Sequence, residues 1–98
     1  MQEEIFYVDI RKNPRYGQFI TVYDKEVKES HKIFKEKAYT KTVNKDELVQ
    51  LLRTSVSIIL YGRKCIEIGI KEKFIHPDAV SKQHGVDVAI YIDTRRYW

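Results

Sequence analysis

The strongest constraint on the fold is a helix signal that begins at Asn44. Asparagine is a preferred N-cap residue, and Glu47 three positions later completes a capping-box pair. Beyond them, apolar residues recur at steps of three and four, which predicts a broad apolar stripe along one side of a helix. We therefore expect a helix from about Lys45 to Tyr61 that ends in a left-handed cap at Gly62. The expected stripe consists of Leu48, Leu51, Leu52, Val56, Ile59 and Leu60.

Strand signals lie on both sides of that helix. Residues 5–11 and residues 86–92 alternate between apolar and polar side chains, as half-buried strands do. Residues 18–23 are rich in β-forming types, and a proline and a glycine suited to a turn precede them, so the first two strands are expected to form a hairpin. Residues 65–70 also alternate, which predicts a strand directly after the helix.

Three segments are expected to connect these elements. Positive and negative charges nearly cancel over residues 24–37, which predicts an exposed connection. Residues 33–43 mix apolar side chains with lysines on one face, as an edge strand protected against pairing does. Residues 76–78, with the sequence His-Pro-Asp, are typical of the entry to a short helix, and Gly85 lies just beyond its expected end.

Together these elements predict an α+β fold. We expect a two-layer sandwich in which a mainly antiparallel sheet of four or five strands packs against one main helix and one short helix. The 98 residues, 43% of them hydrophobic, suffice for one core and are too few for two, so residues 1–98 are expected to form a single domain. No motif indicates a known family.

The sequence also predicts that the chain stays in the cytoplasm. No apolar run approaches the roughly 20 residues that a membrane-spanning helix needs. The acidic start Met1–Glu4 differs from a secretory signal, which has a basic start followed by an apolar stretch.

Few residues suit catalytic or metal chemistry. The single cysteine, Cys65, has no second cysteine at metal-binding spacing and is expected to be a small buried side chain, although a Cys–His pair would activate its thiolate. His76 and His84 are eight residues apart, too far for the helical zinc motif. We therefore expect no enzymatic activity, no metal and no cofactor. The alternative is a nuclease-like carboxylate cluster formed by Asp9, Asp87 and Asp93 on neighbouring strands.

The excess positive charge collects at the ends of the expected elements. Lys and Arg outnumber Asp and Glu by 18 to 14, a net charge of +4. Each cluster is nearly free of acidic residues and has aromatic neighbours, a mixture typical of nucleic-acid surfaces and protein hot spots. The competing interpretation is ordinary solvated loop surface. The candidate nucleic-acid-binding or partner-binding residues are Arg11, Lys12, Arg15, Tyr16, Arg63, Lys64, Arg95, Arg96, Tyr97 and Trp98.

Two functions are expected from these clusters. The first is a nucleic-acid-binding module whose basic residues contact phosphates while Tyr16, Tyr7 or Trp98 stacks on bases. A platform of Tyr7, Tyr91 and Tyr23 on the sheet would serve to stack bases or to bury a protein partner. The alternative is a mobile-element-type regulatory or inhibitory protein that binds a host protein, for example a nucleic-acid-processing enzyme, through the same surface or an exposed strand edge. The expected partner is thus nucleic acid or a nucleic-acid-associated protein. Self-association into a homodimer through an edge strand is a further expectation.

Overall fold

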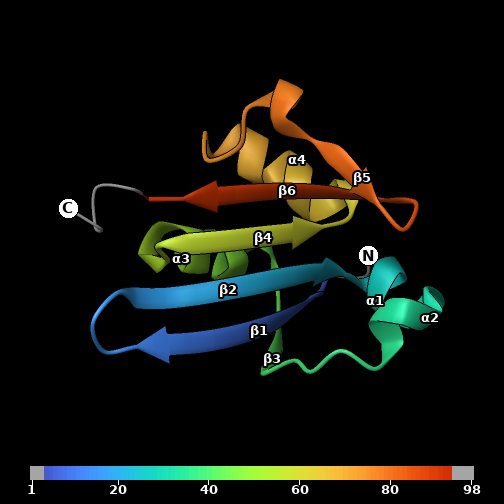
Figure 1. The fold of residues 1–98 in the computed structure, drawn as a ribbon, viewed down its shortest axis with the longest axis horizontal. Coiled ribbons are helices and arrows are strands. Elements are labelled where there is room, and N and C mark those ends of the chain that lie inside the picture. The colour runs from blue at the N-terminus through green and yellow to red at the C-terminus, as the bar shows by residue number, and fades with distance from the viewer. Residues whose placement is uncertain (1–3, 94–98) are drawn as a thin grey trace.

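A computed structural model describes residues 4–93 and shows an α+β fold in which one six-stranded mixed sheet is flanked by four α-helices (Figure 1). The strands are β1 (Phe6–Asn13), β2 (Gly17–Asp24), β3 (Lys41–Val43), β4 (Ser57–Tyr61), β5 (Ser81–Gln83) and β6 (Val86–Ile92). The helices are α1 (Lys25–Ser30), α2 (Lys32–Lys35), α3 (Lys45–Thr54) and α4 (Arg63–Lys71), with the short 3₁₀ helix η1 (Pro77–Ala79).

The predicted α+β class is confirmed, but the sheet differs from the prediction, and four α-helices on both of its faces replace the single layer of one main and one short helix. The sheet has six strands in the order β3-β1-β2-β4-β6-β5, in place of four or five. It is mixed because β2 and β4 run parallel, whereas the other neighbouring pairs are antiparallel. Parallel neighbours need a crossover connection, and here the chain passes through α1, α2, β3 and α3 between the two strands.

The main core lies on the face of the sheet that packs against α3 and α4. Inward side chains alternate along the strands, for example Val8 on β1, opposite Val22 on β2, which in turn lies opposite Leu60 on β4. Leu48 and Leu52 of α3, and Cys65 and Ile66 of α4, complete this core. Figure 1 shows both helices behind the sheet.

A second, smaller core covers one end of the opposite face. Val27 of α1 and Phe34 of α2 pack there with Tyr23 and Val86. Figure 1 shows these two helices gathered at the end of the sheet where β2 finishes. The rest of this face, toward the β1–β2 turn, has no helix over it within residues 4–93.

The helix predicted over residues 45–61 begins where expected, but the observed helix ends earlier than predicted. Its capping box is confirmed, since the Asn44 side chain accepts from the Glu47 N–H at 2.9 Å and Glu47 accepts from the Asn44 N–H at 3.0 Å. α3 nevertheless ends at Thr54, because the Ser55 hydroxyl donates to the Leu51 carbonyl at 2.6 Å while Ser55 itself is extended. The β-branched residues that follow favour a strand and form β4.

The strand predicted over residues 65–70 is wrong, since these residues belong to α4. Gly62, at φ +116°, is the N-cap of α4 and not the C-cap of the preceding helix. Cys65 with Ile68, and Ile66 with Gly69, are buried pairs three residues apart, which is helical spacing.

The segment between β2 and β3 also differs from the prediction. Residues 24–37 contain α1 and α2, not a plain exposed connection. Of residues 33–43, only Lys41–Val43 form a strand, the edge strand β3. The hairpin of β1 and β2 and the strand β6 are confirmed. The short helix expected between His76 and Gly85 is reduced to the 3₁₀ helix η1, because residues 81–83 form the strand β5 against β6. Among the described residues, no helix is long and apolar enough to cross a membrane.

Candidate functional site

The tip of the β1–β2 hairpin is the most sharply defined of the predicted basic clusters. The Asn13 side chain accepts from the N–H groups of Arg15 at 2.8 Å and of Tyr16 at 3.0 Å, which closes the turn. The Arg15 guanidinium carbon lies 5.3 Å from the centre of the Tyr16 ring, within cation–π range. Gly17, at φ +109°, completes the turn above Val56. The turn therefore fixes the backbone from which Lys12 and Arg15 extend into solvent.

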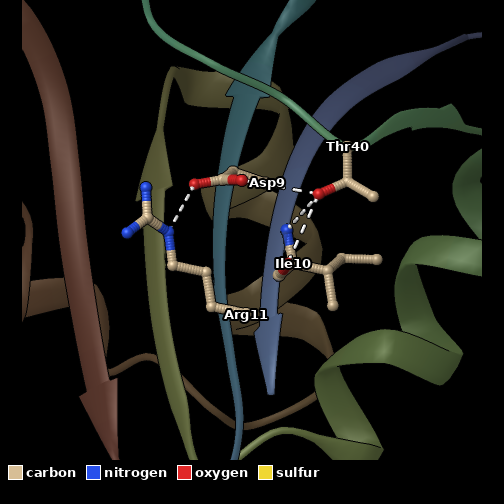
Figure 2. A network of polar contacts seen from close by, with 4 residues as sticks. All are labelled: Asp9, Ile10, Arg11 and Thr40. Carbon is tan, nitrogen blue, oxygen red and sulfur yellow. Dashed lines mark hydrogen bonds and ion pairs between the residues drawn. The ribbon is translucent and has the colours of Figure 1, made fainter. Parts of the chain in front are cut away.

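Arg11 lies beside this tip, on the helix-free part of the sheet, and forms an ion pair with Asp9. Its Nε lies 3.1 Å from Oδ2 of Asp9, while the other oxygen of that carboxylate accepts from the Thr40 hydroxyl at 3.4 Å (Figure 2). The Thr40 hydroxyl oxygen in turn accepts from the Ile10 N–H at 2.8 Å. The network holds Arg11 along the strand, although its side chain stays 75% exposed.

Arg63 and Lys64 lie at the opposite end of the sheet from the hairpin tip. β4 runs parallel to β2, so its final residue, Tyr61, pairs with Tyr23 at the end of β2 farthest from the turn. The two basic clusters therefore do not form one surface. The Arg63 side chain lies 4.0 Å from Asp87 and that of Lys64 lies 3.4 Å from Glu26.

These contacts correct the interpretation that the clusters are nearly free of acidic residues. Carboxylates far away in the sequence lie next to Arg63 and Lys64, and Asp9 lies next to Arg11. Sequence distance concealed the first two pairs, because Glu26 and Asp87 belong to other elements. The basic side chain of each pair is exposed, whereas the carboxylates of Asp9 and Asp87 are largely buried. Ion pairs open to solvent typically contribute about 0–1 kcal/mol, so these contacts restrain the positions of the basic side chains only weakly.

The third predicted cluster, Arg95, Arg96, Tyr97 and Trp98, lies outside the described residues. The strand before it, β6, ends with Ile92 opposite Ser57, which in turn pairs with Phe19. The last described residues therefore lie at the same end of the sheet as the hairpin tip.

The tyrosine rings expected to form a platform are occupied by contacts with other side chains of the protein. Tyr23 is buried and stacks on Tyr61 at 5.5 Å with a 7° interplanar angle, and Phe34 covers both rings. The Tyr7 hydroxyl donates to Glu29 at 2.6 Å, and this hydrogen bond, followed by burial, raises the pKa of Tyr7 to about 12. Tyr91 lies on the other face, against Phe74. No flat array of free rings results.

Sequence reasoning missed the apolar part of the helix-free face. Cross-strand pairs place Phe19 and Ile92 on either side of Ser57, and Ile59 directly beside Ile90. Ile90 and Ile92 are 59% and 51% exposed. We call Phe19, Ile59, Ile90 and Ile92 the open apolar face. Alternation identified these strands, but it does not state which face the helices cover.

A buried carboxylate at the start of α4 was also missed. The Asp24 oxygens accept from the N–H groups of Lys64 and Cys65, both at 2.8 Å. Burial raises the pKa of Asp24, and these two hydrogen bonds oppose part of that rise. Burial, followed by the neighbouring Asp24, raises the pKa of Cys65 well above that of a free thiol, so Cys65 is a packed thiol and not an activated nucleophile.

The alternative carboxylate cluster does not form. β2 and β4 separate Asp9 on β1 from Asp87 on β6, and Asp87 and Asp93 lie at opposite ends of β6. Within residues 4–93 no three His, Cys, Asp or Glu residues are grouped in a way that could hold a metal ion.

Two surface hollows carry charges of both signs. One, of about 370 Å³, lies between the starts of α3 and α4, and its lining includes Lys45, Lys64, Asp46 and Glu67. The other, of about 320 Å³, lies beside Asp24, and its lining includes Arg63, Lys82 and Asp87. Each lining combines positive and negative side chains, so neither hollow favours an anionic or a cationic ligand.

Comparison with known proteins bears on the fold alone. No family model matches the sequence, and no curated protein is similar to it. The structure is similar to the crystal structure of an uncharacterized conserved protein from Methanopyrus kandleri, with a TM-score of 0.64 and 13% sequence identity over 90% of this chain and 91% of that one. A likeness at this identity indicates a shared arrangement of helices and strands.

Proposed function

We propose that the chain is a small, non-enzymatic binding protein of the cytoplasm whose β1–β2 hairpin tip contacts nucleic acid. One observation carries this proposal: the Asn13-closed turn holds Lys12 and Arg15 exposed at the end of a rigid sheet. A fixed turn loses little conformational freedom when it binds, so its two cations are ready to contact phosphates.

The contacts at the tip assign different roles to its residues. Lys12 and Arg15 contact phosphates directly, and the Tyr16 ring beneath Arg15 orients the guanidinium. Arg11 joins after it releases Asp9, which costs little because the Arg11 side chain is exposed and Asp9 keeps its contact with the Thr40 hydroxyl. Arg63 and Lys64 lie at the other end of the sheet and stay outside the contact.

The test is a fluorescence-anisotropy titration against short single-stranded and double-stranded DNA and RNA, at low and near-physiological salt. We expect binding that falls steeply with salt, because phosphate contacts release counterions. Lys12→Glu with Arg15→Glu should weaken binding by at least about tenfold. Absence of binding at low salt would sink the proposal.

The matched control is Arg63→Glu with Lys64→Glu, which makes the same charge change at the opposite end of the sheet. We expect this variant to bind within about threefold of the unchanged protein, since it loses only long-range attraction. An equal loss in both variants would mean that net charge, and not the hairpin tip, drives binding.

A protein partner is the second candidate, as in a regulatory or inhibitory protein that binds a nucleic-acid-processing enzyme. The open apolar face supports it, because contiguous exposed apolar side chains are typical of surfaces that contact other proteins. Arg11 at the margin of this face already pairs with a carboxylate. Such a complex has a defined stoichiometry and a weaker salt dependence than phosphate binding, which separates the two candidates.

A further inference from the structure

The outer edge of β6 is left unpaired over its last part. β5 pairs with β6 only from Val86 to Val88, whereas β6 continues to Ile92. The Asp93 N–H donates to the Val56 carbonyl, and the Asp87 carbonyl accepts from the Gly62 N–H, so the odd-numbered residues direct their main-chain groups toward β4. The N–H and C=O groups of Ile90 and Ile92 therefore point away from the sheet, and no strand within residues 4–93 pairs with them.

This edge lacks the protection that the other edges carry. β3 and β5 are the outermost strands and are three residues long, and each includes an exposed lysine, Lys41 or Lys82. On β1, the Thr40 hydroxyl contacts both main-chain groups of Ile10, and the next outward residue is Lys12. Residues 88–92 of β6 are uncharged and carry exposed isoleucines. Short strands and lysines are the usual defence against edge pairing, and here both are missing.

We propose that this edge pairs with the same edge of a second copy of the chain, in an antiparallel homodimer with a continuous sheet. Around a two-fold axis near Tyr91, Ile90 of one copy lies opposite Ile92 of the other. Each such pair exchanges both of its N–H···O=C bonds, which satisfies the outward main-chain groups described above.

The side chains along this edge fit a second copy. A two-fold axis perpendicular to the sheet places both open apolar faces on the same side, so two isoleucines from each copy form one cluster. The facing segments carry no charge, so no like charges meet at the junction. The antiparallel arrangement also directs the two basic hairpin tips to opposite ends of the combined sheet.

The experiment is sedimentation and light scattering across a concentration series. The contact is small, so a reversible dimer of about twice the 11.7 kDa chain mass is expected, which dissociates on dilution. Added salt should preserve or strengthen the dimer, because it screens the +4 charge of each copy. Nucleic-acid binding by the hairpin tip responds to salt in the opposite direction, so failure of one proposal is distinguishable from failure of the other.

Three variants locate the contact. Ile90→Lys puts a charged side chain directly opposite Ile92 of the second copy, and Ile92→Pro removes an outward N–H while leaving the β4–β6 bonds intact. Both should shift the chain to a monomer at concentrations where the unchanged protein is dimeric, with circular dichroism confirming the fold. Ile33→Lys, at an exposed isoleucine on α2, is the matched control and should remain dimeric. A monomer at every concentration would overturn the proposal, as would a dimer that survives both edge substitutions.

Discussion

Asp24 connects two parts of the molecule through one carboxylate. It is the last residue of β2, and its oxygens accept from the N–H groups of Lys64 and Cys65 in the first turn of α4, some forty residues later in the sequence. Gly62 makes this approach possible, since a Cβ atom there would lie 2.4 Å from the Asp24 Cγ. A negative side chain at a helix N-terminus also interacts favourably with the helix dipole. Sequence inspection alone offers no sign of this contact, because a single aspartate at the end of a strand has no distinguishing neighbours.

The buried Asp24 carboxyl predicts a specific pH dependence of stability. Burial raises its pKa, so over the range from the ordinary value of about 4 up to the raised value the folded chain holds a proton that the unfolded chain has lost. The free energy of unfolding should therefore fall as pH rises through this range. Urea denaturation at a series of pH values should show this fall in the unchanged protein and lose it in Asp24→Asn.

The same variant should be less stable at neutral pH, by about 1–3 kcal/mol, because asparagine offers one acceptor for two N–H groups. Glu26→Gln is a suitable comparison, since Glu26 is exposed and its contact with Lys64 is a surface pair. A pH profile of Asp24→Asn that matches the unchanged protein would show that another group titrates.

The capping box of α3 is the element feature that the sequence predicts most securely. Its two hydrogen bonds join residues three apart, so local sequence is sufficient to specify them. Asn44→Ala should lower the free energy of unfolding by about 1 kcal/mol, measured by urea denaturation. Lys45→Ala is the control at an exposed position next to the cap, with an expected change within about 0.5 kcal/mol. Equal effects of the two changes would contradict a capping role.

The ends and types of the neighbouring elements could not be predicted in the same way. Apolar residues near 56–61 fit helical spacing, yet Ile58 and Leu60 also alternate as a strand requires. Residues 65–70 present the reverse ambiguity, since Ile66, Ile68 and Ile70 alternate within a helix. Short apolar runs satisfy both periods, and tertiary contacts decide between them: β4 pairs with β2 and β6, and Asp24 caps α4.

For the whole molecule, the sequence predicted the α+β class and the hairpin but not the order of the strands. Strand order depends on long-range pairs such as Ile20 with Ile58, which alternation does not encode. The same limit applies to the candidate site. The hairpin tip follows from its own turn residues, whereas the separation of Arg63 from the tip and the open apolar face both follow from the sheet order.

The crossover between β2 and β4 encircles the β1–β2 hairpin. From the end of β2 the chain passes over one face as α1 and α2, runs along the outside of β1 as β3, and returns across the other face as α3 (Figure 1). The hairpin therefore cannot separate from the sheet unless the encircling segment also detaches. Local opening should be confined to elements outside this enclosure, such as β5, whose residues are exposed.

Amide hydrogen exchange under native conditions should show this difference. Protected amides of the central strand β2, such as that of Val22, should exchange only through global unfolding, whereas Lys82 on β5 should exchange through a much smaller opening free energy. Exchange of Val22 as fast as that of Lys82 would argue against the enclosure. The β1–β2 strands that support the basic tip are thus expected to open only when the whole molecule unfolds.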